Sequence, residues 1–93
     1  MAWFIHYNQV MSGDLYMDKR KNVVGEKIRA ARLAEKPPAT QQDLSARLEI
    51  HGVSLSASSI GKIENGTRPV TDLQIIAFAK ALKVLPVWVI SKN

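Results

Sequence analysis

The sequence contains no cysteine, which excludes disulfide bonds, thiolate zinc sites and iron–sulfur clusters. Its 5 glycines and 4 prolines are few, as expected for a mostly helical chain. The apolar runs, such as residues 3–5 and 87–90, are far too short to span a membrane or to form the core of an export signal. These absences fit a protein of the reducing cytoplasm and predict no membrane insertion.

The composition that remains is that of one small globular domain. The chain has 93 residues, of which 46% are hydrophobic and 23% charged, enough for a single modest core. Lysine and arginine exceed aspartate and glutamate by 13 to 8, so the formal net charge is +5. A basic surface on so small a domain indicates a polyanionic partner, either nucleic acid or an anionic membrane.

Residues 1–17 differ from the rest of the chain. Their one formal charge is Asp14, and they hold four of the six aromatic residues, namely Trp3, Phe4, Tyr7 and Tyr16. Such a segment can form a short strand, a hairpin or an arm packed on the domain. Alternatively, residues 1–16 are a translated leader before a start at Met17, because Gly13-Asp14 can be encoded by a purine-rich ribosome-binding pattern. We therefore expect an N-terminal extension at 1–17 and a domain at 18–93.

Apolar residues recur at helical spacing in five later segments, with boundary signals between them. Pro37-Pro38 stops the first segment, Gly52 follows the second, and Pro86 fits the first turn of the last. Thr71 and Gln74 match a capping box at the start of the fourth segment. The sequence predicts a compact all-α domain with helices at 23–36, 40–50, 56–65, 72–83 and 86–91.

The same periodicity predicts which side chains fill the core. Leu73 and Ile76 are expected on the apolar stripe of the fourth helix, and Trp88 is expected to seal the core as a large aromatic anchor. The predicted core residues are Leu44, Leu48, Ile60, Ile63, Ile76 and Leu82.

Residue patterns that carry catalysis or bind metal are lacking. His6 and His51 stand far apart, with no acid at metal-ligand spacing. The serines at 54, 56, 58 and 59 lie in no nucleophile motif, and no phosphate-binding glycine loop occurs. The sequence therefore predicts no enzyme, no catalytic residue, no metal and no cofactor.

The third predicted helix has an unusual outer face. Ile60 and Ile63 are its large apolar residues, and the opposite side carries small or polar ones: Ala57, Ser58, Gly61 and Lys62. Short polar side chains and one lysine can approach base edges in the major groove, whereas bulky or acidic ones are excluded by sterics or phosphate repulsion.

Two runs of residues carry a family resemblance: TQQDLS at 40–45 and SASSIGKIENGTRP at 56–69. They resemble the lambda-repressor/Cro-like (XRE) helix-turn-helix family, over about residues 22–90. The resemblance implies a five-helix domain whose recognition helix, residues 56–65, enters the major groove. Two departures stand out. The link from Glu49 to Leu55 is longer than in the commonest family form, and Ala57 and Gly61 replace larger polar residues of many members.

The resemblance also implies roles for particular residues. Lys62 would donate to guanine O6 and N7, Ala57 would contact a thymine methyl group, and Arg32 and Glu64 would form an internal ion pair. Gln41 would contact a phosphate at the start of its helix, and Asn65, Thr67 and Arg68 would touch the DNA backbone after the recognition helix. Alternatively, Gln41 is a solvated helix start and Asn65 only a helix end. Residues 19–21 are either an arm that reaches DNA or a solvated charge run. The expected DNA-binding residues are Gln41, Ser56, Ala57, Ser58, Lys62, Asn65, Thr67 and Arg68.

The expected function is sequence-specific binding of double-stranded DNA by a small transcriptional regulator, a repressor or an antitoxin-like autoregulator. One module of this size contacts little DNA, so a homodimer on a palindromic site is expected, joined through residues 87–90 or the aromatic extension. A toxin or another regulator is a further possible partner. The alternative is a protein-interaction module that keeps the fold without specific DNA binding.

Overall fold

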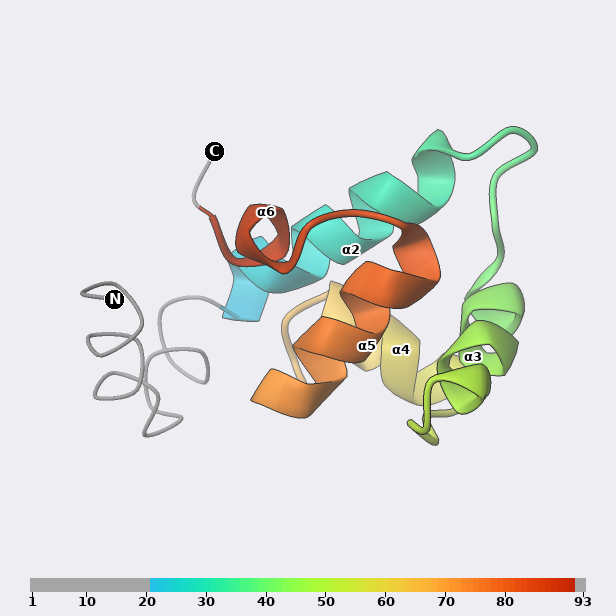
Figure 1. The fold of residues 1–93 in the computed structure, drawn as a ribbon. Helices are drawn as coiled ribbons and strands as arrows, with labels where there is room; N and C mark the ends of the chain where they lie inside the picture. The colour runs from blue at the N-terminus through green and yellow to red at the C-terminus, as the bar shows by residue number, and fades with distance from the viewer. Residues whose placement is uncertain (1–20, 92–93) are drawn as a thin grey trace.

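The computed structural model describes residues 21–91, with side chains from residue 23 onward. Within that range the chain forms five helices and no strand (Figure 1): α2 (Lys21–Ala34), α3 (Gln41–Ile50), α4 (Ala57–Glu64), α5 (Asp72–Leu82) and α6 (Pro86–Ile90). This confirms the all-α fold. The expected extension at 1–17 lies outside the described residues, as do the first two residues of the basic run 19–21.

Side-chain caps set the starts of the middle helices. At α3, Thr40 Oγ1 accepts from the Asp43 amide at 2.9 Å, and Asp43 Oδ2 accepts from the Thr40 amide at 3.0 Å. Thr71 and Gln74 form the same reciprocal pair at α5, which confirms the predicted capping box. The hydrogen bonds from Thr40 lower the pKa of the Asp43 carboxyl.

The core lies where α2, α4, α5 and α6 meet, with α3 packed against α4 and α5. Figure 1 shows α6 lying across α2 at one end of the molecule and α3 at the other end. The largest fully buried side chains come from every helix: Val24, Ile28, Leu44, Leu48, Ile60, Ile63, Ile75, Phe78 and Val89. All five helices therefore close one common core.

Helix α5 buries Leu82 as predicted, but the predictions for Leu73 and Ile76 are wrong. Ile75 is 2% exposed and Phe78 is completely buried, whereas Ile76 is 41% exposed and Leu73 is open to solvent. The large buried side chains, Ile75, Phe78 and Leu82, lie on one helical stripe, and the buried alanines at 77, 79 and 81 widen it. Phe78 is the physical reason, because burying this large ring turns Ile76 outward.

The expectation for Trp88 is also wrong. Val89 is completely buried and anchors α6, while Trp88 is 36% exposed. The Trp88 ring lies at the rim, where Lys27 Nζ stands 4.5 Å from its centroid in a cation–π contact. Pro86 begins α6, and in the resulting short helix position 89, rather than 88, faces the core.

The link between α3 and α4 is held against α3. The Val53 amide donates to Leu48 O at 2.9 Å, and Ser45 Oγ donates to Leu55 O at 2.6 Å. Leu55 is buried in the core, and Gly52 takes a positive φ of 84° just after the helix. The longer link therefore still sets a defined start for α4.

Candidate nucleic-acid interface

Helix α4 divides sharply into a buried and an exposed side. Ile60 and Ile63 are buried in the core, and on the other side Ser58 and Lys62 are exposed. Ala57, in the first turn, is half-buried. The outer face therefore offers short side chains and one cation, as the sequence predicted.

The only acid of α4, Glu64, points inward and meets Arg32 of α2. Arg32 Nε donates to Oε2 at 2.8 Å and Nη2 donates to Oε1 at 2.9 Å, with both residues less than a tenth exposed. Arg32 Nη1 also donates to Ala39 O at 2.9 Å, and the hydrogen bond with Glu64 raises the pKa of Arg32. The ion pair that the resemblance implied is present, and it removes negative charge from the outer face.

Gln41, at the first position of α3, joins this ion pair. Its Nε2 donates to Glu64 Oε1 at 3.0 Å, a bond that the sequence did not indicate. Gly61 leaves room for the amide, because a Cβ there would stand 3.3 Å from Gln41 Nε2. One hydrogen of Nε2 remains as a donor. The amide borders a pocket of about 380 Å³ lined by Glu26, Arg29, Gln41, Gly61, Glu64 and Asn65.

Gly25 lets α2 approach α4 closely. A Cβ at this position would collide with the carbonyl oxygens of Ile63 and Glu64. Only glycine fits such a backbone-to-backbone contact. This role is not among the sequence predictions, although a glycine inside a predicted helix is itself a signal of close packing. Gly25 therefore helps to set the depth at which α4 sits on the domain.

The turn after α4 folds back onto the helix. Asn65 is the C-cap, and its Oδ1 accepts from the Thr67 amide at 3.0 Å and from the Thr67 hydroxyl at 2.7 Å. The amides of Thr67 and Arg68 both donate to Lys62 O, and Gly66 has a positive φ of 82°. Asn65 therefore caps the helix and also orders Thr67. The Nδ2 amino group of Asn65 can still donate hydrogen bonds.

A second set of bonds ties this turn to the start of α4. Ser56 is the N-cap, and its Oγ accepts from the Ser59 amide at 3.1 Å. Arg68 Nη1 donates to Ser59 Oγ at 2.9 Å, so the guanidinium lies beside the first turn of the helix. Ser59 was not among the predicted site residues. A guanidinium has five N–H donors, so Arg68 keeps donors beyond this contact.

The structure thus gathers the predicted residues on one helix and its two flanking turns, with Gln41 packed alongside. Seven of the eight fall between positions 56 and 68. The cations Lys62 and Arg68 are both exposed there. This surface can donate hydrogen bonds to anionic and polar acceptors.

Residues 21–91 contain no group of three histidine, aspartate or glutamate side chains that could hold a metal ion. None of their helices has the length and apolar character needed to cross a bilayer. No protein-family model, curated protein or solved structure matches the chain. The geometry of the α4 surface is therefore the feature that bears on function.

Proposed function

We propose that this chain binds double-stranded DNA sequence-specifically, with α4 in the major groove, as a small transcriptional regulator of the cytoplasm. The observation that carries the proposal is the inward turn of Glu64. Its pairing with Arg32 leaves Ser58 and Lys62 on an outer face without an acid. A phosphate-lined groove repels carboxylates, whereas short polar side chains and a lysine can reach base edges.

The proposed contacts divide into two kinds. Ala57, Ser58 and Lys62 face the bases, with Lys62 suited to the O6 and N7 acceptors of guanine. Contacts to phosphates come from the flanking turns, where donors hold the domain in register on the duplex. The proposed phosphate-contacting residues are Gln41, Ser56, Asn65, Thr67 and Arg68.

The surface is organised before any partner binds, which supports the proposal. Glu64 connects Arg32 of α2 with Gln41 of α3, and Arg68 is bonded to Ser59. Side chains that are already ordered lose less conformational entropy on binding. The recognition surface therefore needs little rearrangement to meet a rigid duplex.

We further propose that two copies bind a palindromic site. A single module of this size buries too little surface for high specificity, and two-fold dimers solve this by reading two half-sites. Leu85 and Val87 are exposed apolar residues at α6, which packs on α2 and α5. They offer a contact surface between copies. Such a dimer can act as a repressor or as an antitoxin-like autoregulator, with a toxin or another regulator as a further partner.

A gel-shift assay with genomic fragments at two salt concentrations tests the proposal. We expect one preferred fragment and a steep loss of affinity at the higher salt, because bound phosphates release counterions. Equal affinity for all fragments would contradict sequence-specific regulation. Absence of binding even at low salt would contradict DNA binding altogether and favour the protein-interaction module.

A further inference from the structure

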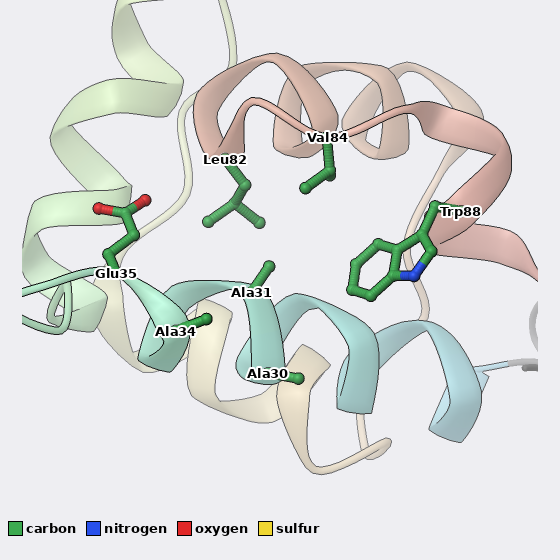
Figure 2. A pocket seen from close by; sticks show the side chains of 7 residues that line it. All are labelled: Ala30, Ala31, Ala34, Glu35, Leu82, Val84 and Trp88. Atoms are coloured by element: carbon green, nitrogen blue, oxygen red, sulfur yellow. The ribbon is translucent and has the colours of Figure 1, made fainter.

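Two hollows in the surface of the described residues differ in chemistry. The α2–α6 groove lies between α2 and the segment that joins α5 to α6 (Figure 2), with Trp88 at one end, Glu35 at the other and a volume of about 460 Å³. Its walls are alanine, leucine and valine side chains, and Glu35 is already paired with Arg47. The second hollow is the polar cleft of about 380 Å³ beside Gln41, between α2, α3 and α4. Of these two hollows, only the polar cleft presents unpaired charged side chains.

Free hydrogen-bond donors gather at the polar cleft. The exposed guanidinium of Arg29, on α2, forms no hydrogen bond or ion pair with residues 23–91. Gln41 Nε2 gives one hydrogen to Glu64 and keeps the other, and Asn65 Oδ1 is occupied within its own turn, so the Asn65 amino group is a donor. A phosphate suits these donors, because its oxygens accept hydrogen bonds and a guanidinium binds two of them at once.

The polar cleft and Arg68 lie on opposite flanks of α4. Successive residues of an α-helix are about 100° apart, so positions 59 and 61 face nearly opposite directions. Ser59 accepts a hydrogen bond from Arg68, whereas Gly61 lines the cleft. Ser58 and Lys62, the residues proposed to face the bases, lie between these two flanks. An arginine therefore stands on each side of the face that would enter the major groove.

We propose that the polar cleft binds a phosphate of the DNA backbone, with Arg29 as the charged ligand and the amides of Gln41 and Asn65 as further donors. The major groove is only about 12 Å wide and has a phosphate backbone along each side, so a helix in it lies near both strands. Arg68 then contacts one strand and Arg29 the other. The inference rests on the proposed DNA binding and adds a residue of α2 to the interface.

Glu26 opposes this contact. It lies three residues before Arg29 on α2 and lines the same cleft, yet no ion pair joins the two side chains. A phosphate in the cleft therefore meets an unpaired carboxylate, which repels it. Because phosphate contacts carry no base information, Glu26 weakens binding to all sequences alike.

Fluorescence anisotropy over a series of salt concentrations tests Arg29. We expect Arg29→Ala to lower affinity about tenfold, for the duplex preferred in the gel shift and for an unrelated duplex alike. The slope of log affinity against log salt should become shallower by about 0.9, because one phosphate contact is lost. Lys80→Ala removes the same charge from an exposed position of α5 and should leave the slope unchanged.

Duplexes that carry one uncharged methylphosphonate each locate the bound phosphate. At one position the substitution should weaken binding by the unaltered chain and by Lys80→Ala, but not by Arg29→Ala, which has already lost the contact. The corresponding position for Arg68→Ala should lie on the opposite strand. A response of Arg29→Ala equal to that of the unaltered chain at every phosphate would overturn the proposal.

Glu26→Gln tests the cleft in the opposite direction. Removing this carboxylate should raise affinity several-fold for every duplex, a gain that damage to the fold does not produce. Glu49→Gln removes the same charge at the other end of α3, about 12 Å from Gln41 at 1.5 Å per residue and beyond the screening length of about 10 Å at 0.1 M salt. No rise for Glu26→Gln, or an equal rise for Glu49→Gln, would contradict the assignment of the cleft.

The outcomes distinguish this inference from DNA binding itself. Urea denaturation should give the same midpoint for Arg29→Ala as for the unaltered chain, since the side chain is exposed and unbonded. An Arg29→Ala chain that keeps the full salt slope on the preferred duplex contradicts the phosphate site and leaves the proposed function standing. A chain that binds no duplex even at low salt contradicts both.

Discussion

The α4 surface and the α2–α6 groove are built in opposite ways. On the α4 surface, polar side chains are bonded to one another, and the buried pair of Arg32 and Glu64 stands behind them. The groove has alanine, leucine and valine walls with one tryptophan at its end. The first surface is ordered and cationic and suits a polyanion, whereas the second suits apolar side chains. One small domain thus offers two surfaces that do not compete for the same partner.

The largest expected effect comes from breaking the ion pair behind the α4 surface. Glu64→Ala leaves Arg32 buried without its partner, so we expect a loss of about 3–5 kcal/mol in the free energy of unfolding. Urea denaturation measures it. Glu35→Ala is the matched control, because Glu35 also pairs with an arginine, Arg47, but both side chains are about one-third exposed. The control should cost roughly 1 kcal/mol or less, and equal losses would contradict the contrast.

The core that both surfaces share gives the next effect. Ile75→Ala should lower the free energy of unfolding by about 2–5 kcal/mol, because it opens a cavity beside Phe78. Ile76→Ala removes the same atoms from an exposed side and should cost roughly 1 kcal/mol or less. Thermal or urea unfolding measures both losses, and their difference reports which of the two isoleucines faces the core. A larger loss for Ile76→Ala would mean that the helix is turned the other way.

Removing one cation from the α4 surface should affect binding rather than stability. Because Lys62 is proposed to read a base, Lys62→Ala should reduce the difference in binding free energy between the preferred duplex and a mutated duplex by about 1–3 kcal/mol. Fluorescence anisotropy with matched and mutated duplexes measures this. Lys80→Ala removes the same charge from an exposed position on α5. An equal change for both variants would show that Lys62 supplies only charge.

The smallest expected effect is a pH dependence at the groove. The hydrogen bonds from Arg47 hold the pKa of Glu35 below its ordinary value. A lowered pKa stabilises the fold above the ordinary glutamate pKa of about 4.3, and this stability is lost as pH falls through the folded value. The drop in unfolding midpoint between neutral and acidic pH should therefore be slightly smaller for Glu35→Gln.

Asp72 provides a control of opposite sign. Burial raises its pKa, so protonation favours the folded state and this carboxyl stabilises the fold as pH falls. Removing it by Asp72→Asn should make the acid-induced drop slightly larger. Thermal unfolding over a pH series measures both variants, and shifts in the same direction would contradict the two assignments.

The helices were predictable because their signals are local. A capping box such as Thr71 with Gln74 lies within four residues, and Pro37 and Pro86 mark boundaries wherever they occur. The outer face of α4 followed from the same periodicity, since Ile60 and Ile63 are its only large apolar residues. Local chemistry was sufficient for these features.

The failures have a common physical cause. In α5, Leu73, Ile75, Ile76 and Phe78 place apolar residues on more than one side, so periodicity does not choose the buried stripe. The run at 87–90 is apolar throughout, so periodicity also does not choose between Trp88 and Val89. Trp88 was predicted to be the core anchor, but Val89 is the buried residue. The bond from Gln41 to Glu64 spans 23 positions and has no local signal at all. Tertiary packing decides all three.

Site-specific photo-crosslinking tests the central claim most directly. The chain has no cysteine, so Ser58→Cys or Lys80→Cys carries a photoreactive label at a single known position. With the duplex preferred in the gel shift, we predict crosslinks to DNA bases from the label at position 58 on α4 and none from the exposed position 80 on α5. Crosslinks from position 80 alone, or a bound complex without crosslinks from position 58, would contradict recognition by α4.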